Sequence, residues 1–259
     1  MNEATQVAVP PIEMHALAAA HEQAPGVPAI EDVNWRVGAG EFWVVGGLHH
    51  SGKSVLLTAA AGINRPLRGQ LRLFGAEPEA LHEDELFRHL LRIGLVFEND
   101  GRLFTRMTVA ENVALPLLYH ANGNDVGAET QVRAVLEATA LLDFADTPAA
   151  SLPRHLRQRV GLARALALSP EVLLVDNPLS RLPLREAGWW LGFLRQLAAG
   201  HSITGRRPMT IVATADELRP WCDCAQHFAV LDQRRLKVLG ARHELEACGE
   251  PLIRELLTA

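Results

Sequence analysis

The stretch Gly47-Leu48-His49-His50-Ser51-Gly52-Lys53-Ser54 decides how this chain folds, because it fits the pattern G-x-x-x-x-G-K-[ST]. Apolar runs at residues 41–46 and 53–61 flank it, which predicts a strand, a loop and a helix in that order. Free N–H groups at a helix N-terminus favour an anion, and the two glycines let the loop curl around one. Lys53 then reaches the phosphates as a point charge, and the Ser54 hydroxyl completes the shell of a bound Mg²⁺. We therefore predict a phosphate-binding loop; the alternative is a chance glycine-rich turn.

Composition and charge limit the class of protein. The chain has 259 residues, of which 48% are hydrophobic and 21% charged, as in a globular protein with one large domain or a domain and a subdomain. The formal charge of -5 argues against nucleic acid as the main partner. No apolar run approaches the ~18 residues of a membrane span, and the acidic N-terminus is unlike a secretory signal, so we expect a cytosolic protein. Cys222, Cys224 and Cys248 are too few for a disulfide framework, and we expect them to be reduced.

Alternating apolar segments predict an α/β fold. Strands are expected at residues 6–9, 12–17, 30–37, 41–46, 70–74, 92–97, 172–175 and 210–214, with a hairpin at 228–231 and 236–239. Helices are expected at residues 53–61, 83–91 and 184–199, and helical spacing runs from 108 to about 168. This order predicts antiparallel strands ahead of the phosphate loop, a mostly parallel sheet, and an inserted helical subdomain.

A phosphate site also needs an acidic residue at the end of a distant strand. The apolar run at residues 172–175 ends in Asp176, where a carboxylate is placed to hold Mg²⁺ opposite the loop lysine. A capping or turn aspartate is the alternative for this position. The adjacent His49 and His50 have no third ligand beside them, so they are weak evidence for a metal site of their own.

With these residues in place, nearly the whole chain resembles the nucleotide-binding subunits of ABC transporters. "GLHHSGKS" (47–54) resembles the Walker A loop, and "IGLVFENDGRLFTRMTVAENVALPL" (93–117) resembles the Q-loop and the start of the helical subdomain. "SLPRHLRQRVGLARALALSPEVLLVDNPLSRL" (151–182) is similar to the signature helix, Walker B strand and D-loop. "IVATADEL" (211–218) resembles the switch strand, and "FAVLDQRRLKVLG" (228–240) the final hairpin.

The resemblance implies a P-loop NTPase fold of the ABC type, with an α/β core at residues 1–98 and 166–259 and a helical subdomain at 99–165. It implies ATP and Mg²⁺ as ligands, bound by Gly47, His49, His50, Ser51, Gly52, Lys53, Ser54 and Asp176. The implied partners are membrane permease subunits and a second nucleotide-binding subunit, in a homodimer or heterodimer on the inner face of the cell membrane. The "ENVALPL" segment favours bacterial importers and lipid-transport ATPases, including those of MCE-type phospholipid systems.

The departures from the family pattern fall on residues expected at the reacting phosphate. The Q-loop glutamine is replaced by Glu98, which could still ligate Mg²⁺ with Ser54 and Asp176 but brings negative charge toward a triphosphate. The catalytic glutamate is replaced by Asn177, which can orient water but cannot take its proton, and such base catalysis contributes about 10²–10⁴-fold. The switch histidine is replaced by Ala215, which offers no hydrogen bond to phosphate.

The segment expected to contact a partner subunit's nucleotide is altered as well. The signature motif is replaced by Leu152-Pro153-Arg154-His155-Leu156, in which Pro153 has neither a hydroxyl nor an N–H group. Arg154 either blocks close approach or supplies a replacement cation. The D-loop segment 180–183 keeps Ser180 and loses its aspartate, and His21 is the ring nearest the expected adenine-stacking position, with a surface histidine as the alternative.

Three hypotheses about function remain open from the sequence. The chain is an ATP-binding ABC subunit with weak or absent hydrolysis, an active ATPase with relocated catalytic groups, or a scaffold whose nucleotide site is vestigial. The retained Lys53, Ser54 and Asp176 argue against the scaffold, because a vestigial site has no need of a cation and two Mg²⁺ ligands.

Overall fold

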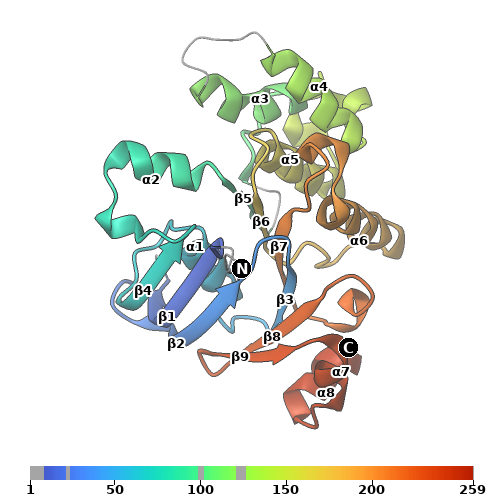
Figure 1. Cartoon of the computed structure of the whole chain (residues 1–259). Helices are drawn as coiled ribbons and strands as arrows, with labels where there is room; N and C mark the ends of the chain where they lie inside the picture. The colour runs from blue at the N-terminus through green and yellow to red at the C-terminus, as the bar shows by residue number, and fades with distance from the viewer. Residues whose placement is uncertain (1–8, 22–23, 99–101, 121–126, 259) are drawn as a thin grey trace, which may run out of the picture.

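A central sheet organises the computed structural model, which describes residues 9–21, 24–98, 102–120 and 127–258 (Figure 1). In spatial order its six strands in these segments are β5 (Ile93–Val96), β6 (Val172–Val175), β7 (Thr210–Ala215), β3 (Phe42–Gly46), β8 (His227–Asp232) and β9 (Arg235–Gly240). The strands from β5 to β8 run parallel, and β9 returns antiparallel to β8 as the predicted hairpin. The prediction of a mostly parallel sheet is confirmed.

Side chains of the parallel strands are buried on both faces, which explains their continuous apolar sequences. Because successive side chains point to opposite faces, each strand contributes to two cores. In β6, Val172 and Leu174 pack toward helix α1 (Lys53–Ala60), whereas Leu173 and Val175 pack toward helices on the other face.

A second, antiparallel sheet covers the face that carries α1. It has the order β2 (Pro28–Val37), β1 (Ile12–Ala20) and β4 (Arg68–Leu73), which confirms the predicted antiparallel part. The backbone N–H of Glu31 donates to the Arg234 carbonyl at 2.7 Å and ties this sheet to the β8–β9 hairpin. Of the strand predicted at 6–9, residues 6–8 lie outside the described residues, and Val9 is not in a strand.

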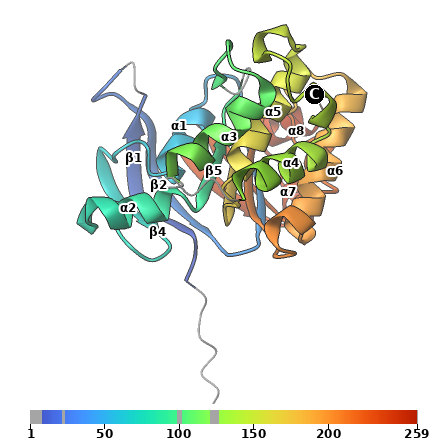
Figure 2. The ribbon, with the colours of Figure 1, turned by 90° about the horizontal axis from the view of Figure 1, so that it is seen from above.

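Helices pack on the opposite face of the central sheet. They are α3 (Val109–His120), α4 (Ala128–Ala138), α5 (Arg154–Leu166) and α6 (Leu184–Ala199), which Figure 2 shows grouped on one side of the molecule. Helix α2 (Glu83–Leu90) lies between the antiparallel sheet and these helices in Figure 1, and its Phe87 ring lies 4.8 Å from the His120 ring of α3. Within the described segments, no helix has both the length and the apolarity needed to cross a membrane.

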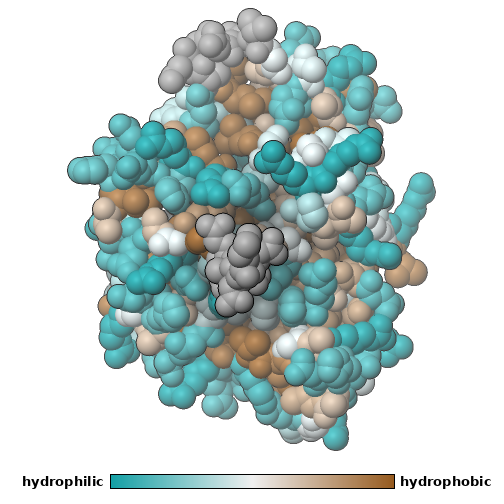
Figure 3. Space-filling view, viewed as in Figure 1, coloured by the Kyte–Doolittle hydropathy of each residue, from teal (hydrophilic) through white to brown (hydrophobic). Residues whose placement is uncertain are grey.

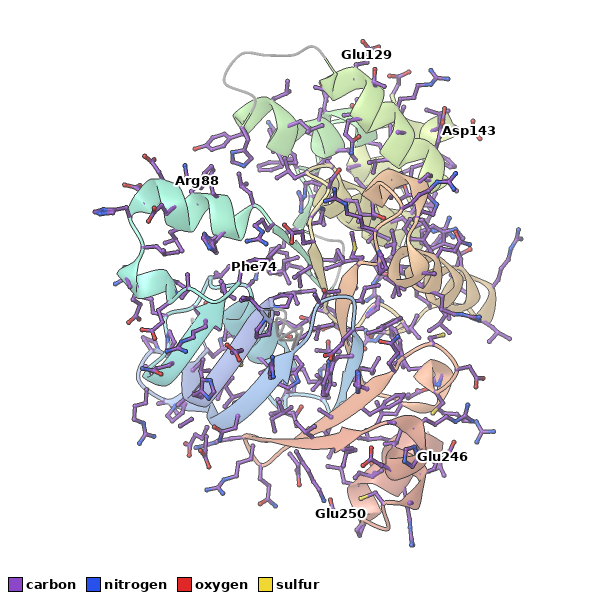
Figure 4. The ribbon with its side chains drawn as sticks, in the orientation of Figure 1. Phe74, Arg88, Glu129, Asp143, Glu246 and Glu250 are labelled. Carbon is purple, nitrogen blue, oxygen red and sulfur yellow. The ribbon has the colours of Figure 1, made fainter. Side chains whose placement is uncertain are left out.

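Two C-terminal helices complete the chain, and the sequence analysis did not predict them. They are α7 (Arg242–Ala247) and α8 (Pro251–Thr258), and Figure 4 shows Glu246 and Glu250 at this end of the molecule, opposite Glu129 and Asp143. The backbone N–H of Leu218, just after β7, donates to the Leu256 carbonyl at 2.7 Å.

The carboxyl ends of the parallel strands meet at one edge of the sheet, where ligands bind in open α/β sheets. Strand β3 ends at the phosphate loop, and β5 is followed closely by Glu98. Strand β6 leads to Asp176 and Asn177, and β7 leads to Asp216. This edge is therefore the candidate site.

Candidate functional site

The phosphate loop has a backbone that only glycine fits at two positions. Gly52 precedes α1 with φ 105°, a left-handed conformation that side chains rarely adopt, and a Cβ there would lie 2.9 Å from the Ala29 carbonyl oxygen. A Cβ at Gly47 would lie 2.6 Å from Ser51 Oγ and 2.7 Å from the Leu231 carbonyl oxygen. Glycine at these two positions therefore lets the loop pack closely against its own chain.

One hydroxyl in the loop is left for a ligand. Ser51 Oγ is buried and has no hydrogen-bond partner among the described residues, which is costly for a polar group unless something else satisfies it. It lies just ahead of α1, where the helix N-terminus already favours negative charge. A phosphate oxygen fits this position, because it accepts from both the hydroxyl and the backbone N–H groups.

Lys53 is the cation of the loop, and three acceptors surround it. Its Nζ donates to the carbonyl oxygens of Gly47 at 2.6 Å and Leu48 at 2.8 Å, and it forms an ion pair with Asp216 Oδ1 at 2.9 Å. The ammonium group, which has three protons, thus has two hydrogen bonds to carbonyl oxygens and one ion pair. A nucleotide phosphate must therefore replace at least one of these contacts.

A short hydrogen-bond chain orders the ends of β6 and β7. Thr214 Oγ1 donates to Asp176 Oδ1 at 2.8 Å and accepts from the backbone N–H of Asn177 at 2.9 Å. All three residues are buried. Asn177 has φ 44°, in the left-handed region that asparagine tolerates better than most side chains. The carboxylate of Asp176 is thus held at a fixed position beside the loop.

The side-chain amide of Asn177 lies between two carboxylates. Its Nδ2 donates to Glu98 Oε1 at 3.1 Å and to Asp216 Oδ2 at 2.8 Å. Carboxylates only accept, so the NH₂ end of the amide must face both of them. Asn177 therefore joins the segment after β5 to the segment after β7.

Asp216 is ionised at neutral pH. Burial acts to raise the pKa of this carboxyl, but hydrogen bonds from Lys53 and Asn177 and the nearby charges outweigh it and hold the pKa below its usual range. Its negative charge therefore stays beside Lys53 across the physiological range.

Three cavities surround these groups. The one along the phosphate loop has a volume of about 450 Å³ and is lined by His49, His50, Ser51, Gly52, Lys53, Ser54, Glu98, Asp176 and Asn177. A second, of about 510 Å³, is lined by Asn177, Ala215, Asp216, the D-loop residues Ser180 and Arg181, and the buried ring of Trp221. A third, of about 300 Å³, contains Ser54, Asp176 and Glu98 together. Glu98 lines all three.

The residues that would hold Mg²⁺ do not form a complete site by themselves. Among the described residues, no group of three or more His, Cys, Asp or Glu side chains is arranged to hold a metal ion. Ser54 and Asp176 line one cavity beside the loop, and Mg²⁺ takes few protein ligands when phosphate oxygens complete its shell. The donor set therefore fits a Mg²⁺ that arrives with a polyphosphate, supplying charge neutralisation there.

The structure brings most of the predicted site residues to this edge and places one group elsewhere. The cavities described above are lined by residues 48–54 of the loop and by Glu98, Asp176, Asn177 and Ala215, and His21 lines two of them. The predicted site residue Gly47 lines none of the three. Residues 152–156 lie at the start of α5 and line none of the three. The sequence analysis missed Asp216 and Thr214, although both are polar residues at the carboxyl end of a buried strand.

A parallel sheet, a glycine loop closed by Lys53 and Ser54, and a buried strand ending in Asp176 define a P-loop nucleotide-binding domain. The chain belongs to the ABC transporter family, whose model matches residues 30–180, more than half of the sequence. The resemblance and the fold class inferred from the sequence are both confirmed.

Similar proteins agree with this assignment. The chain is 34% identical over 210 residues to the methionine import ATP-binding protein MetN of Carboxydothermus hydrogenoformans, covering 81% of this chain and 60% of that protein. It is 35% identical over 221 residues to the sulfate/thiosulfate import ATP-binding protein CysA of Nephroselmis olivacea, covering 84% of this chain and 60% of that protein. The chain thus spans about 60% of the length of these two relatives.

Solved structures show the same fold. The structure of cbiO1 from Clostridium perfringens, part of the ABC transporter complex cbiONQ, has a TM-score of 0.77 at 20% identity, covering 95% of this chain and 94% of that one. The dimer of the ATP-binding cassette MJ0796 bound to ADP and Pi has a TM-score of 0.75 at 23% identity, covering 87% of this chain and 96% of that one.

Proposed function

We propose that this chain is the ATP-binding subunit of an ABC importer, which binds ATP with Mg²⁺ and couples its nucleotide state to membrane permease subunits. The observation that carries the proposal is the convergence of Ser51, Lys53, Ser54 and Asp176 on one cavity of about 450 Å³. The unpaired hydroxyl of Ser51 and the cation of Lys53 can both donate to phosphate oxygens. Ser54 and Asp176 supply oxygen ligands for the Mg²⁺ that accompanies a polyphosphate. The import names of the relatives support the transport direction.

Slow or absent hydrolysis is part of this proposal. Asn177 supplies an amide where a base would take the proton of the attacking water, and both protons of that amide point at carboxylates. Ala215 lines the 510 Å³ cavity, which Asn177 also lines, and its methyl group forms no hydrogen bond to phosphate. The site therefore supports binding more strongly than turnover.

The membrane partner is assigned to the region between α2 and the helical part. Exposed apolar side chains collect there, including Phe87 on α2 and Leu118 and Tyr119 on α3. The Phe87 and His120 rings lie 4.8 Å apart, so the two helices meet at this point. Figure 3 shows brown apolar areas among the helices in the upper part of this face. Such a patch suits a permease loop, and it would hold the chain at the inner face of the cell membrane.

Two further assignments rest on the family resemblance. We take residues 1–98 and 166–259 as the α/β core and residues 99–165 as the helical subdomain. The position of residues 152–156 outside the chain's own cavities supports a head-to-tail dimer in which each signature helix serves the other subunit. The partner is a second copy or a related subunit, and the lean toward lipid-transport systems stays a prediction.

Calorimetric titration of ATP tests the proposal. The purified protein should bind ATP in the presence of Mg²⁺ and bind it more weakly in EDTA. Lys53→Ala should weaken ATP binding by at least about tenfold, because a charge-assisted contact to phosphate is lost. Lys237→Ala is the matched control, since Lys237 is the other lysine of the sequence, lies on β9 and pairs with Glu250, which directly precedes α8. Equal affinity of both variants would contradict the proposal.

A further inference from the structure

The side chains at positions 98 and 177 form a contacting pair of one carboxylate and one amide. Glu98 Oε1 accepts from Asn177 Nδ2 at 3.1 Å. The family resemblance placed an amide at position 98 and a carboxylate at position 177, so this chain carries the two groups in exchanged positions. The site therefore still contains a carboxylate at this contact, although position 177 has none.

We infer that Glu98 is the catalytic carboxylate of this site and that Asn177 is a positioning residue that holds it. This inference rests on the proposed ATP-binding function and names the group through which the slow turnover proceeds. Glu98 takes a proton from water while the water oxygen forms a bond to the γ-phosphorus of ATP. The bond from that phosphorus to the bridging oxygen breaks, and its electron pair leaves with ADP. The products are ADP, phosphate and the proton that Glu98 then returns to solvent.

Glu98 lies where a general base is needed. A base must lie within hydrogen-bond reach of the attacking water, directly beside the phosphate. Glu98 lines the loop cavity that contains Lys53, and it also lines the 510 Å³ cavity that contains Asn177 and Ala215. Its side chain thus lies at the boundary between these two cavities.

Asp216, the other carboxylate at this boundary, is already engaged. Its Oδ1 is paired with Lys53 at 2.9 Å and its Oδ2 accepts from Asn177 at 2.8 Å. In the part of the chain that the structure describes, Glu98 has one hydrogen bond, from Asn177, which leaves its second oxygen for water. Asp216 therefore restrains Lys53, and Glu98 is the carboxylate with capacity to accept a proton.

The surroundings of residue 177 explain why it is an amide. A glutamate there would face Glu98 and Asp216 where Nδ2 now donates to both, placing three carboxylates in contact. Carboxylate groups in contact repel one another strongly, particularly in a partly buried site. An amide satisfies both carboxylates, and it also suits the left-handed backbone at this position.

Single-turnover phosphate release and ATP calorimetry on the full-length purified protein test the inference. Glu98→Gln keeps the shape of the side chain, so we expect unchanged Mg²⁺-dependent ATP affinity and turnover lower by about 100-fold. Glu129→Gln, at the distant end of α4, is the matched control and should leave both unchanged. Asn177→Glu alone should not raise turnover, whereas Glu98→Gln with Asn177→Glu should recover turnover relative to Glu98→Gln.

Thermal unfolding gives a readout that does not depend on turnover. Asn177→Glu should lower Tm by about 2–4 °C or more, and adding Glu98→Gln should recover part of that loss, because it removes one of the three clustered charges. If Glu98 had only a structural role, Glu98→Gln would lower Tm. The double variant would then recover neither turnover nor Tm.

Four results would overturn the inference while leaving ATP binding intact. The first two are turnover in Glu98→Gln equal to that of wild type, and loss of Mg²⁺-dependent ATP affinity in that variant. The third is loss of turnover in Asp216→Asn in place of Glu98→Gln. The fourth is a wild-type protein that binds ATP but releases phosphate no faster than Lys53→Ala. A wild-type protein that binds no ATP would overturn the proposed function and this inference with it.

Discussion

Lys53 Nζ lies 2.9 Å from Asp216 Oδ1, so the lysine of the loop is paired with a carboxylate of its own chain. The ammonium group is buried, whereas 37% of the Asp216 side chain is exposed to solvent. Solvent screens a pair of this kind, and its contribution is about 1 kcal/mol. A phosphate that approaches Lys53 therefore competes with this ion pair as well as with the two carbonyl contacts.

Removing the charge of Asp216 should therefore tighten ATP binding. We expect Asp216→Asn to lower the Kd for ATP by about fivefold in calorimetry, since about 1 kcal/mol no longer has to be given up. Glu217→Gln is the matched control, because Glu217 lines the same cavity and carries the same charge but has no contact with Lys53 among the described residues. Equal tightening in both variants would mean that net charge, and not the ion pair, governs affinity.

Glycine at position 47 should be indispensable for the loop. Gly47→Ala places a Cβ 2.6 Å from Ser51 Oγ and 2.7 Å from a backbone oxygen, so we expect destabilisation of about 1–3 kcal/mol and ATP binding weaker by at least about tenfold. Chemical denaturation and calorimetry measure the two effects. Gly188→Ala, at an exposed position of α6 where a Cβ meets nothing within 4 Å, should instead stabilise by about 0.5–1 kcal/mol. The same loss in both variants would contradict the steric account.

Stability should depend on pH through Glu171. Hydrogen bonds from Arg92 to this carboxyl, at 2.7 and 2.9 Å, lower the pKa of Glu171 below its ordinary value. A depressed folded pKa means that the stabilisation is complete above the unfolded value of about 4.3 and is lost as pH falls through the folded pKa. Because Glu171 is 58% exposed, we expect Glu171→Gln to cost at most about 1 kcal/mol in urea unfolding at pH 7. The difference from wild type should shrink as pH falls below the unfolded value and vanish once pH is below the folded pKa. A difference that stays constant with pH would contradict the ion-pair explanation.

The start of α5 should limit turnover in the dimer. Pro153 precedes the helix with no side-chain cap, and Arg154 and His155 follow as its first residues. Replacing them together by Ser, Gly and Gly supplies a hydroxyl and open N–H groups, each worth about tenfold or more when aimed at developing charge. We expect faster phosphate release at protein concentrations that favour the dimer, and no change in ATP affinity at low concentration. A faster rate that is independent of protein concentration would contradict a role in the partner's site.

Segments with one dominant apolar pattern were predictable from sequence. The bounds of β6 and α6 are those expected from their apolar runs. Strand β6 is buried on both faces and α6 is buried along one broad face, so the apolar residues of each fit only one secondary structure. Helices α7 and α8, of six and eight residues, were missed. Helix α1 is as short as α8, but the glycine-loop motif directly ahead of it predicts its start, and α7 and α8 have no such motif.

Asp216 was missed for a different reason. Its importance depends on the pairing of Gly46 with Ala215, which sets β7 beside the strand that enters the phosphate loop. That register joins residues far apart in the sequence, and local patterns do not encode it. The contact between Glu98 and Asn177 is of the same kind, so a residue-by-residue comparison with a family pattern records two losses where the folded chain has one pair.

The buried ring of Trp221 gives the site its own optical reporter. It lines the cavity shared by Asn177 and Asp216 and packs edge-on against Phe42, with ring centroids 6.2 Å apart, at the start of the strand that leads to the phosphate loop. Indole emission responds to the polarity around the ring, so a nucleotide that changes the water content of this cavity changes the fluorescence of the unlabelled protein. Trp221→Phe identifies that part of the signal, because Trp35 and Trp43 belong to the opposite core and Trp189 and Trp190 to α6.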